Sequence, residues 1–250
     1  MNLLLFRADE LDPDGVVRLS GRRARHLSEV LRVSPGQRLR AGLVRGGQGT
    51  ARVEGVQRDE VTLSLALQGP PAICPPVEVI LALPRPKVLS RVLRSVASFG
   101  VAAIELVNAW RVEKSYFASD RLQPQRLEQD VWLGCEQGGT TWLPDVRVHP
   151  RFRPFVEDEL PRRLSPALSR ALVAHPHAAD PIERVVAPGS KQRLVVAIGP
   201  EGGWIESELR SFETSGFVSV RFSERVLSVE SAAAALLAQL ELLRRGGGGE

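Results

Sequence analysis

Residues 195–209 read VVAIGPEGGWIESEL, in which an apolar run enters a Gly-Pro-Glu-Gly-Gly turn and is followed by acidic and apolar residues at helical spacing. A glycine-rich turn between a strand and a helix is a common binding site for phosphate. A P-loop, however, places Lys and then Ser or Thr after its last glycine, whereas Trp204 and Ile205 follow Gly203 here. The glycines at 199, 202 and 203 also do not match the G-x-G-x-x-G dinucleotide spacing. The sequence therefore disfavours a phosphate ligand at this turn.

The charge of the turn favours a different ligand. Glu201 is its only charged residue, and Glu206 and Glu208 follow in the first turn of the expected helix, where they repel an incoming anion. Because glycine allows main-chain amides to approach a ligand closely, a neutral or cationic ligand lying along the backbone fits better. A plain tight turn that needs a positive φ at Gly202 or Gly203 is the structural alternative.

The composition places the chain among globular proteins. Its 250 residues are 43% hydrophobic, and no run approaches the roughly 18–20 apolar residues of a membrane helix. The start, MNLLLFRADELDPDG, turns acidic after a few residues, unlike a signal peptide. Cys74 and Cys135 make neither a disulfide framework nor a metal site. We therefore expect a cytoplasmic protein with no membrane and no metal partner.

A domain boundary is expected at residues 69–79, GPPAICPPVEV, because the four prolines fix φ and remove backbone donors. Before it, alternating strands broken by glycine predict a small β-barrel or a twisted sheet. After it, apolar strands alternate with helical segments, which predicts an α/β domain with a parallel sheet. The expected strands are VEVILALP, VAAIELVN, RALVAH, RLVVAIG and VSVRF, and the expected helices are KVLSRVLRSVASFG (ended by Gly100), PQRLEQDVWLGCEQGG and ESAAAALLAQLELLR.

Basic residues concentrate near the N-terminus. Residues 16–45 contain eight arginines and a single acid, Glu29. Such a local excess attracts polyanions such as nucleic acid, although a solvated arginine-rich surface is nearly as good an explanation.

Two C-terminal motifs, IGPEGGWIESEL (198–209) and RVLSVESAAAALL (225–237), resemble those of the uracil-N3 methyltransferase family of small-subunit ribosomal RNA. HLSEVLRVSPGQ (26–37) resembles the N-terminal RNA-binding motif of that family, and residues 83–117 and 135–146 resemble its central segments. The resemblance thus extends over nearly the whole chain. The family is a branch of the knotted SPOUT-class methyltransferases, which use S-adenosylmethionine.

The resemblance implies a C-terminal, trefoil-knotted α/β domain with a parallel sheet over residues 79–245 and a PUA-like β-barrel over residues 1–70. Residues 71–78 would form a proline-rich linker, and residues 246–250 a flexible tail. It also implies a homodimer that acts on 16S ribosomal RNA or on the small ribosomal subunit. The RNA contacts expected in the N-terminal domain are Arg22, Arg23, Arg25, His26 and Arg32.

The resemblance further implies that three loops, at RALVAH, AIGPEGG and FSERVLS, converge on S-adenosylmethionine. The sulfonium cation of this cofactor is compatible with Glu201, in agreement with the charge of the turn. The residues expected to contact the cofactor are Leu172, Ala174, Ile198, Gly199, Pro200, Glu201, Gly202, Gly203, Phe222, Ser223, Val226, Leu227 and Ser228.

Methylation of uracil N3 requires an unpaired base, loss of the N3 proton and alignment of N3 with the methyl group. Glu230 is the candidate base or orienting carboxylate, and Arg225 is the second catalytic candidate. An acid that only complements the helix dipole explains Glu230 equally well.

Several positions depart from the family pattern. Phe222-Ser223 replaces the usual Leu-Gly, Ser228 replaces an Arg, and the Arg expected shortly after Gln137 is absent. In an active enzyme Arg221, Arg225 or Arg147 would have to replace the lost cations. The alternative is a divergent relative that binds RNA without methylating it. The intact IGPEGG turn favours the enzyme, and a nucleotide hydrolase is disfavoured because the P-loop lysine and an acidic metal cluster are missing.

Overall fold

The computed structural model of the protein describes residues 2–246 and divides the chain into two compact units. One unit contains the chain up to Cys74 together with Cys135–Leu143, and the other contains Pro75–Gly134 and Pro144 onward. The sequence-based boundaries treated residues 79–245 as one continuous domain and did not anticipate that residues 135–143 belong to the first unit. Of the expected tail, residues 247–250 lie outside the described residues.

The first unit is a five-stranded sheet in the order β1-β3-β4-β5-β2, in which only β1 and β3 pair in parallel. It matches the predicted N-terminal β domain. Among the described strands, the edge strands β1 and β2 do not pair with each other, so the sheet does not close into a barrel. Alternating residues such as Val53 and Leu63 face its core. Its elements are β1 (Leu4–Phe6), β2 (Val16–Ser20), α1 (Gly21–Arg25), a π-helical turn (His26–Val30), β3 (Arg38–Leu43), β4 (Gln48–Val56) and β5 (Glu60–Leu67).

Residues 135–143 complete the first unit through main-chain and aromatic contacts. The amides of Asn2 and Leu3 each donate to the Glu136 carbonyl at 3.0 Å, and the Leu5 amide donates to Glu136 Oε1 at 3.3 Å. The Arg45 guanidinium lies 4.9 Å from the centre of the Trp142 ring. The segment that lacks the family arginine is therefore built into the packing of this unit.

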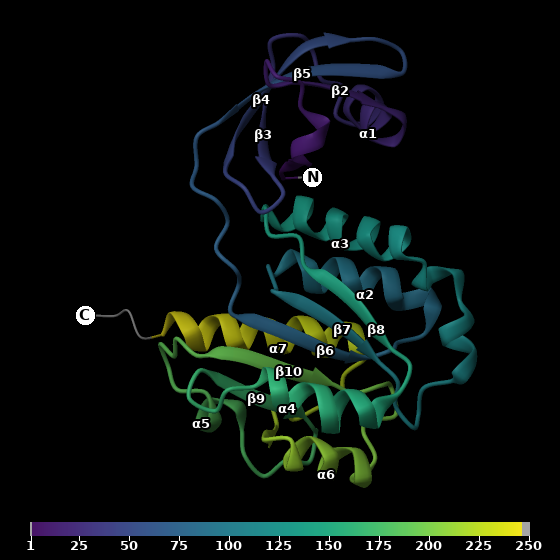
Figure 1. The fold of residues 1–250 in the computed structure, drawn as a ribbon, viewed down its shortest axis with the longest axis vertical. Helices are drawn as coiled ribbons and strands as arrows, with labels where there is room; N and C mark the ends of the chain where they lie inside the picture. The colour runs from purple at the N-terminus through teal and green to yellow at the C-terminus, as the bar shows by residue number, and fades with distance from the viewer. Residues whose placement is uncertain (1, 247–250) are drawn as a thin grey trace. The chain divides into compact units, whose positions relative to one another are not determined.

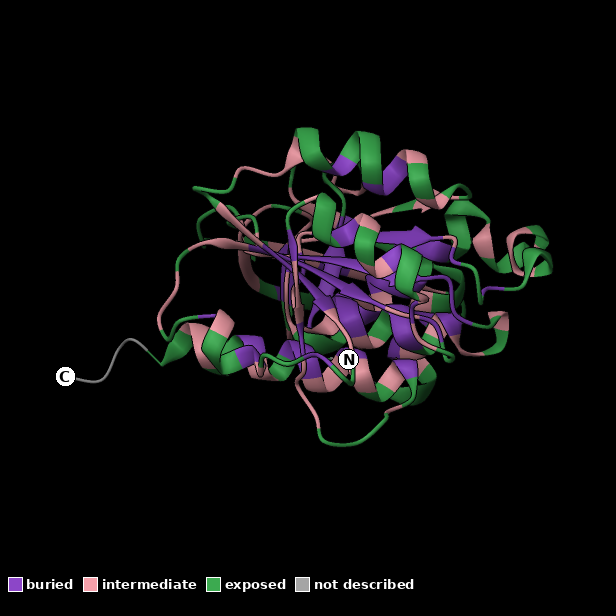
Figure 2. Cartoon of the chain, turned by 90° about the horizontal axis from the view of Figure 1, so that it is seen from below, coloured by how far each residue is buried: buried purple, intermediate pink, exposed green. Residues whose placement is uncertain are grey.

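The second unit contains a six-stranded parallel sheet in the order β11-β9-β10-β6-β7-β8, which confirms the predicted α/β domain (Figure 1). The strands carry mostly buried residues, whereas the helices expose their outer sides (Figure 2). The strands are β6 (Val77–Ala82), β7 (Ala103–Val107), β8 (Asp145–His149), β9 (Ser169–Ala174), β10 (Arg193–Ile198) and β11 (Phe217–Val220). The helices are α2 (Pro86–Ser98), α3 (Pro124–Gly138, whose residues 135–138 belong to the first unit), α4 (Leu160–Arg163), α5 (Ile182–Val185), α6 (Glu206–Thr214) and α7 (Val229–Arg245).

The helices follow the apolar patterns from which they were predicted. In α2, Leu89, Val92, Leu93 and Val96 are buried, and the chain leaves the helix at Gly100 with φ +68°. Helix α3 approaches α2 so closely that a Cβ atom on Gly134 would lie 2.4 Å from the Arg94 carbonyl oxygen. Only glycine fits at this contact.

Strand β8 was not predicted, because the apolar residues of DVRVH are only two valines among charged side chains. The short helices after it, a π-helical turn (Pro154–Glu159) and α4, were missed as well. They carry proline at or near their first positions and are too short to show a helical period.

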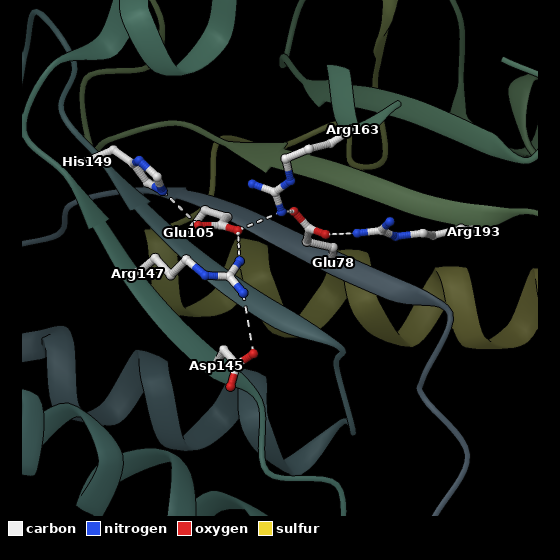
Figure 3. A network of polar contacts seen from close by, with 7 residues as sticks. All are labelled: Glu78, Glu105, Asp145, Arg147, His149, Arg163 and Arg193. Carbon is white, nitrogen blue, oxygen red and sulfur yellow. Dashed lines mark hydrogen bonds and ion pairs between the residues drawn. The ribbon is translucent and has the colours of Figure 1, made fainter. Parts of the chain in front are cut away.

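A network of charged side chains lies on the second unit's sheet, where the apolar runs of β6 and β7 each contain one glutamate (Figure 3). Glu105 is fully buried and binds Arg147, Arg163 and His149, each at 2.7 Å. Glu78 is also buried and binds Arg163 and Arg193. The network joins β6, β7, β8 and β10 to α4, so that the buried carboxylates are neutralised by cations from several elements.

Candidate functional site

A pocket of about 310 Å³ lies at the carboxyl ends of β9, β10 and β11, three neighbouring strands of the parallel sheet. The loops after these strands supply most of its lining, so the three predicted loops do converge. This edge of a parallel sheet is where open α/β folds bind their ligands. The lining residues are Arg111, Ala174, His175, Pro176, His177, Ile198, Gly199, Pro200, Glu201, Gly202, Gly203, Trp204, Phe222, Ser223, Arg225, Val226, Leu227, Val229 and Ala232.

The Gly-Pro-Glu-Gly-Gly turn forms one wall of the pocket. Gly203 has φ +75°, and its amide donates to the Pro200 carbonyl at 2.8 Å. The tight-turn explanation is therefore correct for Gly203, while Gly202 has no positive φ. A Cβ atom on Gly199 would lie 3.2 Å from Trp204 Nε1, so glycine here lets the backbone lie against the indole ring. The turn is both a tight turn and a pocket wall.

Trp204 closes the inner side of the pocket. Its ring packs against Phe212 with ring centres 5.0 Å apart, and only 4% of the residue is exposed. Its buried Nε1–H has no hydrogen-bond partner among residues 2–246. An unpaired buried donor is costly, so a ligand acceptor in the pocket would be stabilised by pairing with it.

Of the residues predicted to contact the cofactor, eleven line the pocket: Ala174, Ile198, Gly199, Pro200, Glu201, Gly202, Gly203, Phe222, Ser223, Val226 and Leu227. Two do not. Leu172 is fully buried within β9, two residues before the strand reaches the pocket edge. Ser228 is the N-cap of α7, where its Oγ accepts a hydrogen bond from the Ser231 amide at 3.3 Å. The Leu172 side chain packs in the core, and the Ser228 side chain caps α7.

Sequence reasoning missed Arg111, which lies over the glycine turn. Its guanidinium donates to the Gly202 carbonyl, and a Cβ atom on Gly202 would lie 2.8 Å from its Cδ. A cation from another loop therefore lies beside the turn, whose own sequence carries only the charge of Glu201. Arg111 is 91 residues from Gly202 in sequence, and only the fold brings it to the turn.

Two histidines in the loop after β9 were missed as well. The rings of His175 and His177 are 5.8 Å apart, and both residues line the pocket. Burial lowers the pKa of His175, and the neighbouring His177 lowers it further. Both effects favour the neutral form of the His175 ring.

The two predicted catalytic residues lie in different places. Arg225 lines the pocket. Glu230 lies in the first turn of α7 and does not line the pocket. Its Oε2 lies 3.5 Å from Nη2 of Arg91. Of the possible replacement cations, Arg147 is part of the sheet network and Arg221 binds Glu224 at 3.0 Å. Only Arg225 among these three arginines reaches the pocket wall.

The predicted RNA-contacting residues lie on α1 and the π-helical turn of the first unit, except Arg32, which follows that turn. Arg22, Arg25 and Arg32 are exposed, and His26 is half-buried. Arg23 is different, because its guanidinium binds Glu10 and the Leu5 carbonyl inside the unit. Arg23 therefore stabilises this unit, and its contact with RNA remains a prediction.

No helix in the described part of the chain is long and apolar enough to cross a membrane. Among residues 2–246, no cluster of three or more His, Cys, Asp or Glu side chains could hold a metal ion.

Residues 72–241 match the family model of the RNA methyltransferase domain, and residues 19–66 match that of the RNA methyltransferase PUA domain. Among curated proteins, the ribosomal RNA small subunit methyltransferase E of Treponema pallidum is 30% identical over 241 residues, which cover 95% of this chain and 90% of that protein. The protein of the same name from Synechocystis is 24% identical over 96% of this chain and 77% of its own length.

Solved structures share the fold of both units. A ribosomal RNA small subunit methyltransferase E from Neisseria gonorrhoeae bound to S-adenosyl methionine has a TM-score of 0.75 and 22% identity, covering 96% of this chain and 97% of that chain. A methyltransferase from Legionella pneumophila in complex with the bound cofactor SAM has a TM-score of 0.74 and 25% identity, covering 96% of each chain.

Proposed function

Because the chain belongs to the RNA methyltransferase family, we propose that it transfers the methyl group of S-adenosylmethionine to N3 of a uracil in the 16S ribosomal RNA of the small subunit. The observation that carries the proposal is the pocket at the ends of β9, β10 and β11, which gathers all three loops that the family resemblance assigned to the cofactor. The relatives named for small-subunit ribosomal RNA support the substrate class, and those solved with S-adenosylmethionine support the cofactor.

The pocket wall has the mixed charge that this cofactor needs. S-adenosylmethionine carries a sulfonium cation and, at its amino-acid end, a carboxylate. Glu201 supplies a negative charge at the pocket, while Arg111 and Arg225 supply positive charges. Ile198, Leu227 and the Trp204 ring are apolar surfaces suited to an adenine ring, and Trp204 Nε1–H is a free donor beside them. These residues would hold the cofactor, which supplies the methyl group when bound.

The remaining chemistry is positioning of the base and removal of the N3 proton. Holding N3 in line with the methyl group supplies the largest share of the acceleration, on the order of 7–11 kcal/mol in favourable cases. A positioned base adds about 10²–10⁴-fold. Arg225 is placed to interact with substrate at the pocket, whereas Glu230 would have to leave Arg91 to act as the base.

Calorimetry with S-adenosylmethionine, followed by mass analysis of ribosomal RNA from a strain that lacks this chain, tests the proposal. We expect saturable binding to the protein and loss of N3-methyluridine from the 16S RNA of that strain. Binding of RNA with the modification unchanged would support the alternative, a divergent RNA-binding module without the methyl-transfer activity. A protein that binds neither the cofactor nor RNA would contradict both.

The RNA surface of the first unit gives a second prediction. Charge reversal of Arg22 and Arg25 to Glu is expected to weaken binding of 16S RNA whatever its sequence, because both side chains are exposed on α1. The slope of log affinity against log salt should fall by about one for each phosphate that the protein no longer neutralises. The measurement is a filter-binding titration at several salt concentrations.

Arg58→Glu is the matched control, since Arg58 is exposed on the same unit but lies in the turn between β4 and β5, outside the arginine-rich stretch. Arg23→Glu is unsuitable because it would break the contacts of Arg23 with Glu10 and Leu5. Affinity that does not change with salt would show that this surface is not the RNA platform.

The trefoil knot and the homodimer remain predictions of the family resemblance, and the cytoplasmic location remains a prediction from the composition. Sedimentation velocity of the purified protein tests the dimer directly.

A further inference from the structure

Trp110 is the only aromatic residue among the large apolar residues exposed in the described part of the chain, and 79% of it is accessible to solvent. It belongs to the segment that leaves the carboxyl end of β7. A tryptophan that is mostly exposed buries little area in the fold, and large aromatic side chains left in solvent often mark binding sites. The exposure of Trp110 therefore indicates a binding site for a partner.

The backbone that carries Trp110 is held firmly. The Trp110 amide donates to Glu208 Oε1 at 2.6 Å, and Glu208 is 5% exposed. The other oxygen of Glu208 accepts the Ile205 amide at 3.0 Å, so one carboxylate joins Trp110 to the start of α6. The Asn108 side chain adds a bond to the Pro150 carbonyl at 2.9 Å. The fold thus presents this side chain from a fixed position.

That position is beside the pocket. The next residue, Arg111, lines the pocket and donates to the Gly202 carbonyl. Glu208, which holds the Trp110 amide, belongs to the helix that begins directly after the glycine turn. Trp110 therefore lies one peptide away from the wall of the site proposed to hold the cofactor.

Cations lie in the same segment as Trp110 and beside the glycine turn. Lys114 is exposed in the same segment, and Arg85, 67% exposed, reaches within 4.0 Å of Glu201 in the glycine turn. An exposed aromatic ring with nearby Lys and Arg side chains is the arrangement by which proteins bind unpaired nucleotides, the ring stacking on a base and the cations facing phosphates.

We propose that Trp110 stacks on an unpaired base of the substrate RNA at the methylation site and so positions the target uracil at the pocket. The proposal rests on the function proposed above, since a uracil must leave base pairing before its N3 can be reached. Trp110 is on this view a positioning residue, and it takes part in no proton transfer or bond change.

The test compares Trp110→Ala and Trp110→Phe with the unchanged protein. The measurements are the dissociation constant for S-adenosylmethionine, the dissociation constant for 16S RNA from a strain lacking this chain, and the kcat and KM of methyl transfer. For Trp110→Ala we expect unchanged cofactor affinity, and a roughly 10- to 100-fold loss in RNA affinity and kcat/KM, because stacking on one base is lost. Trp110→Phe, which keeps an aromatic face, should recover most of that loss.

Leu168→Ala is the matched control, because Leu168 is 71% exposed but precedes β9, at the opposite end of the parallel sheet from the pocket. It should leave all three measurements unchanged. Equal RNA affinity and kcat/KM for Trp110→Ala and the unchanged protein would overturn the proposal. So would a change of oligomeric state in Trp110→Ala, seen by sedimentation, because the ring would then cover a second copy of the chain.

Failure of this inference is distinct from failure of the proposed function. If the unchanged protein transfers no methyl group, the proposed function fails. The RNA affinities of the Trp110 variants still decide whether the ring binds a base.

Discussion

Gly203→Val is expected to weaken binding of S-adenosylmethionine about 100-fold or more and to remove measurable methyl transfer. Gly203 has φ +75°, a conformation that a β-branched residue adopts only at a cost of about 1–3 kcal/mol. The turn can relieve this strain only by moving, and its movement would displace the backbone of Pro200 and Gly202, which forms the pocket wall. Calorimetry with the cofactor measures the effect.

A second glycine provides the control for this variant. Gly216 has φ +88° with open space around its Cβ position, and it lies between α6 and β11, outside the pocket lining. Gly216→Val carries the same backbone strain and should lower the melting temperature to a similar extent without changing cofactor affinity. Equal cofactor affinity in Gly203→Val and Gly216→Val would show that the turn does not form the binding site.

Replacing Glu105 with Leu is expected to destabilise the second unit by about 3–5 kcal/mol, because the change removes the buried carboxylate that three side chains of the network share. Arg163, 30% exposed, would keep its ion pair with Glu78, but Arg147 and His149 would lose their buried partner Glu105. Urea unfolding measures the loss. Asp145→Asn is the control, since Asp145 binds Arg147 at the surface at 3.3 Å and should contribute less than about 1 kcal/mol.

The same network makes the free energy of unfolding depend on pH in the acidic range. Burial by itself raises the pKa of Glu105, but hydrogen bonds from His149 and Arg163 and the charges of Arg163 and Arg147 outweigh it and lower the pKa to about 2 from the ordinary 4.5. The folded protein therefore gains stability from ionised Glu105 above pH 4.5 and loses it as the pH falls from about 4.5 to 2. The loss corresponds to about 3 kcal/mol. Urea unfolding between pH 2 and 7 should show this component in the unchanged protein and not in Glu105→Leu.

The main elements of both units could be predicted from sequence because their residues repeat with the period of a strand or a helix. The apolar stripe of α2 and the runs that form β9 and β10 are buried as their patterns indicated. Strand β8 escaped prediction because it alternates two valines with charged or polar residues, of which Arg147, which is exposed, and His149, which is half-buried, pair with the buried Glu105. A charge pair across 42 or 44 residues leaves no periodic signal.

The candidate site was predictable where it is made of main chain and small residues in one motif. The glycine turn and the loop before α7 line the pocket as expected. Arg111 could not be found in this way, since it reaches the turn from a different loop. Local charge density also does not reveal that one guanidinium of the cluster, that of Arg23, is bound to Glu10 within the fold.

The position of Glu136 has a practical consequence for protein engineering. Severing the chain at the proline-rich linker to obtain a separate RNA-binding fragment would remove the carbonyl and carboxylate oxygens that accept the amides of Asn2, Leu3 and Leu5. It would also remove the Trp142 ring that packs against the Arg45 guanidinium. A truncation after Cys74 should therefore give a poorly soluble, partly unfolded product, and a useful fragment would need residues 135–143 grafted back onto it.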